Sequence, residues 1–116
     1  MMYNLTGDEV YNEYARYQID CLLGVNAVAY SYVTGFGEHA AEHPHHRPSA
    51  AKNEPMPGMV IGGPDSGLHD PTAEEHLQGK PAAKCYIDEL LSFSTNEITL
   101  YWNSAMILLM TQLLAK

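Results

Sequence analysis

Residues 94–115 read STNEITLYWNSAMILLMTQLLA, and this stretch decides the fold class. Its first four residues have the form of a capping box, with Ser94 as the N-cap and Glu97 three residues later. The apolar side chains that follow cover most of the circumference of a helix over about 95–115. A helix that is apolar nearly all round has to be buried on several sides. The sequence therefore predicts an all-α chain that packs onto something larger than itself.

A second helix is predicted near the start of the chain, over about 8–23. Its larger side chains recur at helical spacing, at Val10, Tyr14, Tyr17 and Cys21. Thr6 or Asp8 is suited to cap its start, and Gly24 is suited to end it. Two helices are too few to bury the apolar surface of residues 95–115, which again indicates a larger partner.

The middle of the chain, about 25–83, is predicted to be a long loop rich in Gly, Pro and His. All seven prolines lie between Pro44 and Pro81, and all six histidines lie between His39 and His76. Only residues 72–77 have a helical pattern. Loops longer than about 12–15 residues are uncommon in compact domains and are usually functional. We therefore expect this loop to be a working surface.

Composition and charge exclude several classes of partner. The 116 residues are 46% hydrophobic and 17% charged, as in one globular domain, and the formal net charge is −8. Such a surface repels nucleic acid and anionic membranes, so neither is expected as a partner. The longest apolar run, Ala105 to Met110, is too short to span a bilayer. No signal peptide is predicted at Met1, and Cys21 and Cys85 do not reveal the compartment.

The first candidate site is Pro44-His45-His46-Arg47-Pro48. A residue before proline is biased towards extended backbone, so His45 and Arg47 are expected to point to the same side. Their side chains form a row of donors suited to sugar hydroxyls or to a carboxylate. The alternative is a solvated loop. A metal site made by the three neighbouring histidines lacks a flanking ligand at the usual zinc spacing, so no metal ligand is predicted.

Three further residues each have two interpretations. Glu97 is either a helix-capping residue or a general acid, which must hold its proton near neutral pH. Burial against the aromatic residues Phe93 and Trp102 favours the protonated form, whereas a helix N-terminus disfavours it. Asp88 is either a second active-site carboxylate or a polar turn residue. Trp102, the single tryptophan, belongs either to the core or to a stacking platform for a sugar ring.

Two long segments resemble the active-site signatures of glycoside hydrolase family 9, and they occur in the family's order. In the first, residues 31–47 read SYVTGFGEHAAEHPHHR, with Pro44, His45 and Arg47 among the matching positions. In the second, residues 86–104 read YIDELLSFSTNEITLYWNS, with Asp88 and Glu97 among them. Further similarities upstream and between the segments extend the resemblance over nearly the whole chain.

The resemblance implies a fold and an activity. It implies the last hairpins of an (α/α)6 barrel, incomplete as a barrel on its own, with residues 1–116 as the C-terminal segment of one catalytic domain. It implies an inverting endo-β-1,4-glucanase that acts on cellulose or cello-oligosaccharides and is secreted as the full-length enzyme. No cofactor is expected to be required. Many family members hold structural calcium, but this sequence offers no ligand set that we would name.

The resemblance also assigns roles to the candidate residues. It implies that Glu97 is the general acid, that His45 and Arg47 bind glucose near the cleavage point, and that Asp88 is the active-site aspartate of the second signature. Trp102 is then a candidate sugar contact.

One part of the catalytic machinery is absent from this sequence. Inversion needs a second carboxylate as base, about 6.5–9.5 Å from the acid. In the family that base comes from an Asp-rich motif, and residues 1–116 contain no such motif. We therefore expect the missing N-terminal part of the domain, or self-association, to complete the chain. The alternatives are a non-catalytic glycan-binding remnant and a structural remnant of such an enzyme.

Overall fold

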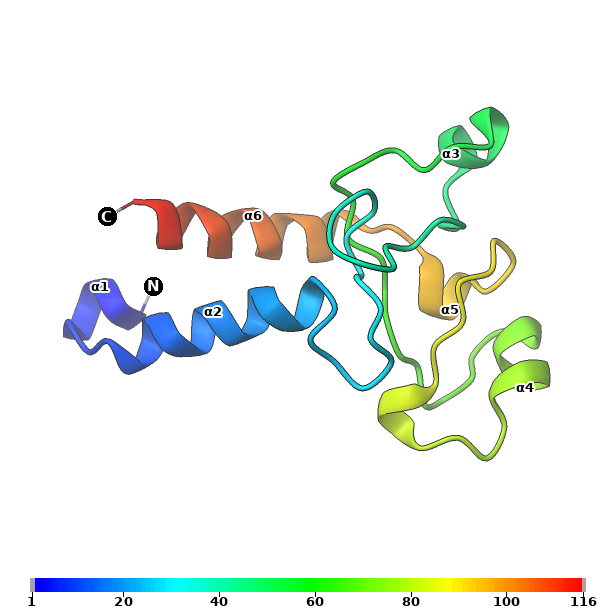
Figure 1. Ribbon diagram of the computed structural model, residues 1–116, viewed down its shortest axis with the longest axis horizontal. Coiled ribbons are helices and arrows are strands. Elements are labelled where there is room, and N and C mark those ends of the chain that lie inside the picture. Colours follow the sequence, from blue (N-terminus) through cyan, green and yellow to red (C-terminus); the bar gives the residue numbers. More distant parts are fainter. Residues whose placement is uncertain (1, 116) are drawn as a thin grey trace.

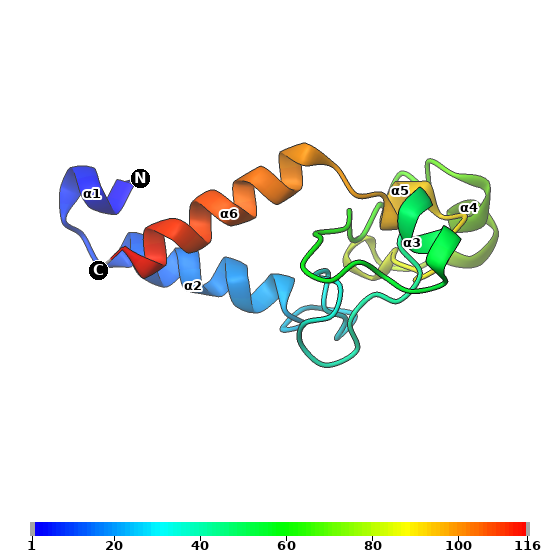
Figure 2. The same ribbon diagram turned by 90° about the horizontal axis from the view of Figure 1, so that it is seen from above.

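The computed structural model describes residues 2–115, and its two longest helices, α2 (Val10–Leu22) and α6 (Leu100–Leu114), lie side by side. A short α1 (Met2–Thr6) contacts the start of α2 at the end of the molecule where both chain termini lie (Figure 1). Everything between α2 and α6 forms the opposite end. Seen from above, α6 crosses over α2, so the two helices diverge towards the loop region (Figure 2).

The loop region contains four short helical segments. They are α3 (Arg47–Lys52), α4 (Pro71–Leu77), the 3-10 turn Ala82–Lys84 and α5 (Phe93–Asn96). Within residues 2–115 there is no β-strand, and the extended segments meet only at four isolated bridges. The regular elements are therefore helical, as predicted. None of the helices in this part of the chain is long and apolar enough to cross a membrane.

The core lies in the loop region. Tyr86 packs between Tyr30 and Tyr32, with ring centroids 5.2 and 5.3 Å away, and Ile61 and Ala41 complete this buried cluster. A smaller cluster beneath α4 contains Ala73, Leu77 and Cys85. The polar stretch around residues 25–83 thus holds most of the buried apolar side chains.

The predicted capping box is wrong. The long helix begins at Leu100, and its N-cap is Thr99, whose hydroxyl oxygen accepts from the amide of Trp102 at 3.4 Å. Residues 93–96 form the separate α5, after which Glu97 has extended backbone (φ −66°, ψ 145°). Ser94 does not cap a helix because its amide and hydroxyl both donate to the carboxylate of Asp70. The capping interpretation of Glu97 is therefore excluded.

The extended backbone predicted for Arg47 is also wrong. Arg47 is the first residue of α3, and the extended residue is its N-cap His46 (φ −141°, ψ 112°). Pro48 lies in the first turn of α3, where its fixed φ and missing N–H suit a helix start. The predicted alternation of side chains from His45 to Arg47 therefore does not apply.

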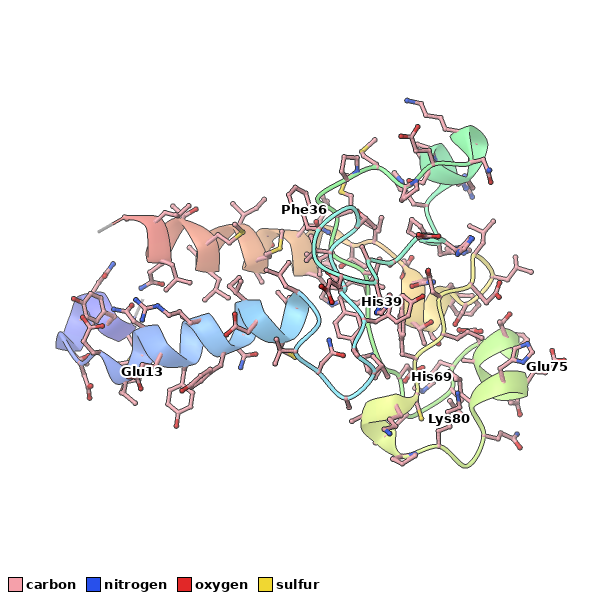
Figure 3. The ribbon with its side chains drawn as sticks, viewed as in Figure 1. Glu13, Phe36, His39, His69, Glu75 and Lys80 are labelled. Atoms are coloured by element: carbon pink, nitrogen blue, oxygen red, sulfur yellow. The ribbon has the colours of Figure 1, made fainter. Side chains whose placement is uncertain are left out.

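No residue of α6 is buried within the described chain. Leu100, Ile107, Leu108 and Leu114 are among its exposed apolar side chains. Two cavities of about 280 and 300 Å³ open between α2, α6 and the loop region. Phe36 lines the smaller one with Met106 and Met110, and Figure 3 shows its ring near the start of α6. The apolar surface that the sequence predicts to be covered is thus left open.

Candidate active site

Glu97 lies in the extended link between α5 and α6, with its side chain exposed. Its backbone is fixed by a parallel bridge to His45 and by a 3.1 Å hydrogen bond from its amide to the carbonyl of Phe93. The carboxylate makes no hydrogen bond or ion pair with any residue in the described range 2–115. A fixed backbone thus presents an unengaged carboxyl group at the surface of the loop region.

The His45 ring is held by its Nδ1 atom. Nδ1 lies 2.7 Å from the carbonyl oxygen of Leu90, and because a carbonyl only accepts, Nδ1 carries the proton and donates. The ring also meets the edge of Phe93, with centroids 6.1 Å apart. Nε2 is left for solvent or a ligand. The main-chain amide of His45 donates to the carbonyl of Asn96 at 2.9 Å, which fixes the segment beside Glu97.

Asp88 is almost covered, with a side chain 7% exposed. Its carboxylate accepts from the amides of Glu42 and His43, at 2.8 and 3.0 Å, and from the side-chain amide of Asn96 at 3.0 Å. The His43 ring nitrogen lies 3.4 Å away. Four donors therefore surround this carboxylate, and it fastens the backbone that leads into His45.

Arg47 and Trp102 lie outside this junction. Arg47 is exposed at the start of α3, and its guanidinium contacts no other described residue by hydrogen bond or ion pair. The Trp102 ring lies against Gly62, where an added Cβ would come within 3.1 Å of the ring, and it lines the 300 Å³ cavity. Trp102 remains 38% exposed. The structure thus brings His45, Asp88 and Glu97 together, whereas Trp102 packs in the groove beside α2.

A cavity of about 330 Å³, with a mixed polar and apolar lining, opens next to the His45 segment. Its lining side chains come from the turn before His45, from α3 and the loop after it, and from Leu90; they include Glu42, His43, Ser49, Asn53 and Glu54. Among residues 2–115, no three His, Cys, Asp or Glu side chains are grouped so that they would hold a metal ion.

Two buried polar residues near the site were not predicted from the sequence. Asn96 is fully buried directly before Glu97, and Asp70 is 2% exposed at the start of α4. Burial by itself raises the pKa of Asp70, but the hydrogen bonds from Ser94, the Ala73 amide and Ser92 outweigh it and lower the pKa. Burial, with the nearby charge of Asp88, raises the pKa of Tyr86, whose hydroxyl donates to Asn96. Only the Asp70-Pro71 start of α4 carries a local sequence signal, as an N-cap before a proline.

The sequence and the fold were compared with known proteins. The family model described as glycosyl hydrolase family 9 matches residues 1–110. A cellodextrinase of Butyrivibrio fibrisolvens is 50% identical over 100 residues, which are 83% of this chain and 18% of that protein. The cellulose 1,4-beta-cellobiosidase of Acetivibrio thermocellus is 42% identical over 108 residues.

Solved structures agree with the sequence match. A mutant of the thermostable endoglucanase from Alicyclobacillus acidocaldarius superposes with a TM-score of 0.85 at 46% identity, covering 88% of this chain and 20% of that one. The chain spans less than a fifth of the length of the two curated relatives. The match of sequence and fold over nearly all of its residues shows that the chain belongs to glycosyl hydrolase family 9.

Proposed function

We propose that this chain supplies the general-acid side of the cleft in an inverting endo-β-1,4-glucanase. The observation that carries the proposal is the backbone bridge between the two signature segments at His45 and Glu97. Both side chains are exposed there, and neither the Glu97 carboxyl group nor the His45 Nε2 has a hydrogen-bond partner among residues 2–115. An acid that protonates a leaving group has to be reachable by substrate and held on a rigid backbone. Glu97 meets both conditions.

In the proposed reaction, Glu97 gives its proton to the glycosidic oxygen as the bond from that oxygen to the anomeric carbon breaks. Water attacks the anomeric carbon from the opposite face and loses its proton to a carboxylate base about 6.5–9.5 Å from the acid. We infer that this base comes from sequence outside residues 1–116. The products are two shorter glucans, and the new reducing end has the inverted, α configuration.

The remaining candidate residues bind or orient. With the proton of the neutral ring on Nδ1, His45 accepts at Nε2 from a glucose hydroxyl. Arg47, always charged, offers several donors to the substrate from the start of α3. Asp88 has its acceptor sites occupied by the amides of Glu42, His43 and Asn96, so we assign it to holding the His45 segment in place rather than to proton transfer. A sugar contact by Trp102 stays a prediction, since its ring is partly exposed but packs on Gly62.

The chain is proposed to form the last hairpins of an (α/α)6 barrel, with α6 covered by other helices of that barrel. The open apolar side chains of α6 and the two cavities beside it support this arrangement. We further propose that the complete enzyme is secreted, requires no cofactor, and takes cellulose or cello-oligosaccharides as substrate.

One observation favours a second candidate function. Residues 1–116 contain no Asp-rich motif to supply the base, whereas the proposed sugar contacts His45 and Arg47 are present and exposed. A glycan-binding remnant would need those contacts and no base. The two candidates differ in whether Glu97 ever has to release a proton.

A hybrid enzyme tests the proposal. In it, residues 1–116 replace the matching region of the cellodextrinase relative, and the hybrid is assayed on carboxymethylcellulose and cellotetraose beside the isolated chain. We expect hydrolysis by the hybrid alone, with α-anomeric product seen first by NMR. A β-anomeric product would overturn inversion. No hydrolysis by a hybrid that melts like its parent would overturn the catalytic role and leave glycan binding.

A further inference from the structure

Asn96 combines complete burial with an unusually full set of hydrogen bonds. Its Nδ2 atom donates towards Asp88 Oδ1 at 3.0 Å, the His43 carbonyl at 3.2 Å and the Glu89 carbonyl at 3.3 Å. Its Oδ1 atom accepts from the Tyr86 hydroxyl at 3.1 Å. The side chain is 0% exposed, so none of these partners is exchanged for water.

The main chain of the same residue joins the two signature segments. The Asn96 carbonyl accepts from the amide of His45 at 2.9 Å, and the next residue, Glu97, is bridged to His45. One residue therefore contacts the segment before His45, the segment containing Asp88, and the backbone that carries Glu97. Those contacts lie 53, 8 and 1 positions away in the sequence.

An amide is the side-chain group that this position needs. The three groups facing Nδ2 are all acceptors, while the Tyr86 hydroxyl facing Oδ1 is a donor, because burial raises its pKa and keeps its proton in place. Only Asn and Gln carry both a two-hydrogen donor and an acceptor on one planar group, and Gln is one methylene longer. A carboxylate here would set acceptor against acceptor in a buried site, where an unmatched polar group is costly.

We propose that Asn96 is a positioning residue that sets the placement of the Glu97 carboxyl relative to the His45 ring. The proposal rests on the proposed role of Glu97 as general acid. The Asn96 amide touches neither substrate nor solvent, and it acts by fixing where the two exposed groups stand. Loss of its hydrogen bonds releases the Glu97 link from the His43–His45 segment, and small misplacements of this kind cost roughly 10²-fold in rate.

A purely structural role predicts something different. A residue that only stabilises the fold lowers the activity on every substrate by the same factor, because it lowers the amount of folded enzyme. A residue that positions a general acid lowers the rate most where the leaving group needs the proton. The ratio of activity on cellotetraose to activity on a dinitrophenyl cellobioside therefore separates the two roles.

The test is Asn96→Asp in the hybrid enzyme, with Asn103→Asp as the matched control. Asn103 makes a similar set of bonds, accepting from the Val60 amide at 3.0 Å and donating to the carbonyls of Val60 and Thr99, but it lies on α6 away from the junction. We expect Asn96→Asp to lower kcat on cellotetraose roughly 10²-fold and to lower it much less on the dinitrophenyl substrate. Asn103→Asp should change kcat on both substrates by the same factor.

A milder variant keeps the test decisive if Asn96→Asp unfolds. Tyr86→Phe removes only the hydroxyl that donates to Asn96. We expect kcat on cellotetraose to fall roughly 3–10-fold, the equivalent of one neutral hydrogen bond. The fall on the dinitrophenyl substrate should be smaller. Equal losses on both substrates for Tyr86→Phe would overturn the proposal. Glu97→Gln in the same hybrid shows whether the positioning role of Asn96 or the acid role of Glu97 is wrong. Full activity of Glu97→Gln would mean that Glu97 is not the general acid, so the proposed function itself would fail.

Discussion

Asp70 is the residue whose replacement the structure lets us predict in most detail. Its Oδ1 atom accepts from the Ala73 amide at 2.7 Å and so caps α4. Its Oδ2 atom accepts from the Ser94 amide at 3.0 Å and from the hydroxyls of Ser92 and Ser94 at 2.9 and 2.5 Å. Asp70 thus fastens α4 to the turn that leads into Glu97.

Asp70→Asn keeps the size of the side chain but leaves one oxygen to accept. The serine hydroxyls rotate and accept from the new NH₂ group, whereas one of the two backbone amides loses its acceptor. A hydrogen bond to a charged group contributes about 1.5–3 kcal/mol, so the free energy of unfolding should fall by about that amount. Glu74→Gln, the same change at an exposed position of α4, should stay within about 0.5 kcal/mol of wild type.

The assay is urea unfolding of residues 1–116, followed by circular dichroism at low protein concentration. Folding lowers the pKa of Asp70 below its ordinary value of 3.8. Its contribution to stability is therefore fully present above pH 3.8 and is lost as pH falls from that value through the lowered pKa of the folded state. The difference in the free energy of unfolding between wild type and Asp70→Asn should therefore decrease from pH 6 to pH 3. A difference in unfolding free energy that is absent at pH 6, or that increases on acidification, would refute the reasoning.

Three further predictions concern the candidate sugar contacts and α6. Arg47→Ala should leave the free energy of unfolding unchanged, since its guanidinium makes no hydrogen bond or ion pair with a described residue. It should raise KM of the hybrid enzyme on cellotetraose about 10-fold or more, and an unchanged KM would remove Arg47 from the site. Trp102→Ala should lower the free energy of unfolding by roughly 1–2 kcal/mol, because its ring packs on Gly62 but is 38% exposed. Intact stability with a raised KM would instead support sugar stacking. The isolated chain should self-associate through the exposed apolar side chains of α6, and sedimentation velocity should detect this. Leu108→Lys should shift the chain towards monomer. A wild-type chain that is monomeric at all concentrations would count against an uncovered interface.

Local patterns predicted the elements whose stabilising contacts are local. The periodicity from Val10 to Cys21 lies within α2, and the short helix expected at 72–77 corresponds to α4. Helix α3 was missed because a proline was interpreted as extending the residue before it, whereas Pro48 here occupies a first helical turn.

The candidate site depends on partners far away in the sequence. Ser94 matched a capping box, but its hydroxyl is taken by Asp70, 24 residues earlier, so the helix starts later and Glu97 stays extended. Asn96 meets His43 from 53 positions away, and no local pattern predicts that contact. The residues with candidate chemistry could therefore be singled out from the sequence, and the resemblance to the family assigned their roles, whereas the buried polar residues that hold them in place could be found only from the fold.

The central claim is that Glu97 is the general acid, and Glu97→Gln in the hybrid enzyme tests it most directly. Gln keeps the size of the side chain but has no acidic proton to deliver, and general acid–base catalysis is typically worth about 10²–10⁴-fold. Because the Glu97 carboxylate makes no hydrogen bond or ion pair with residues 2–115, the variant should fold and melt like the unmodified hybrid. We predict a fall of about 10²–10⁴-fold on cellotetraose and a much smaller fall on a dinitrophenyl cellobioside, whose leaving group needs no proton. Unchanged activity on cellotetraose would contradict the account.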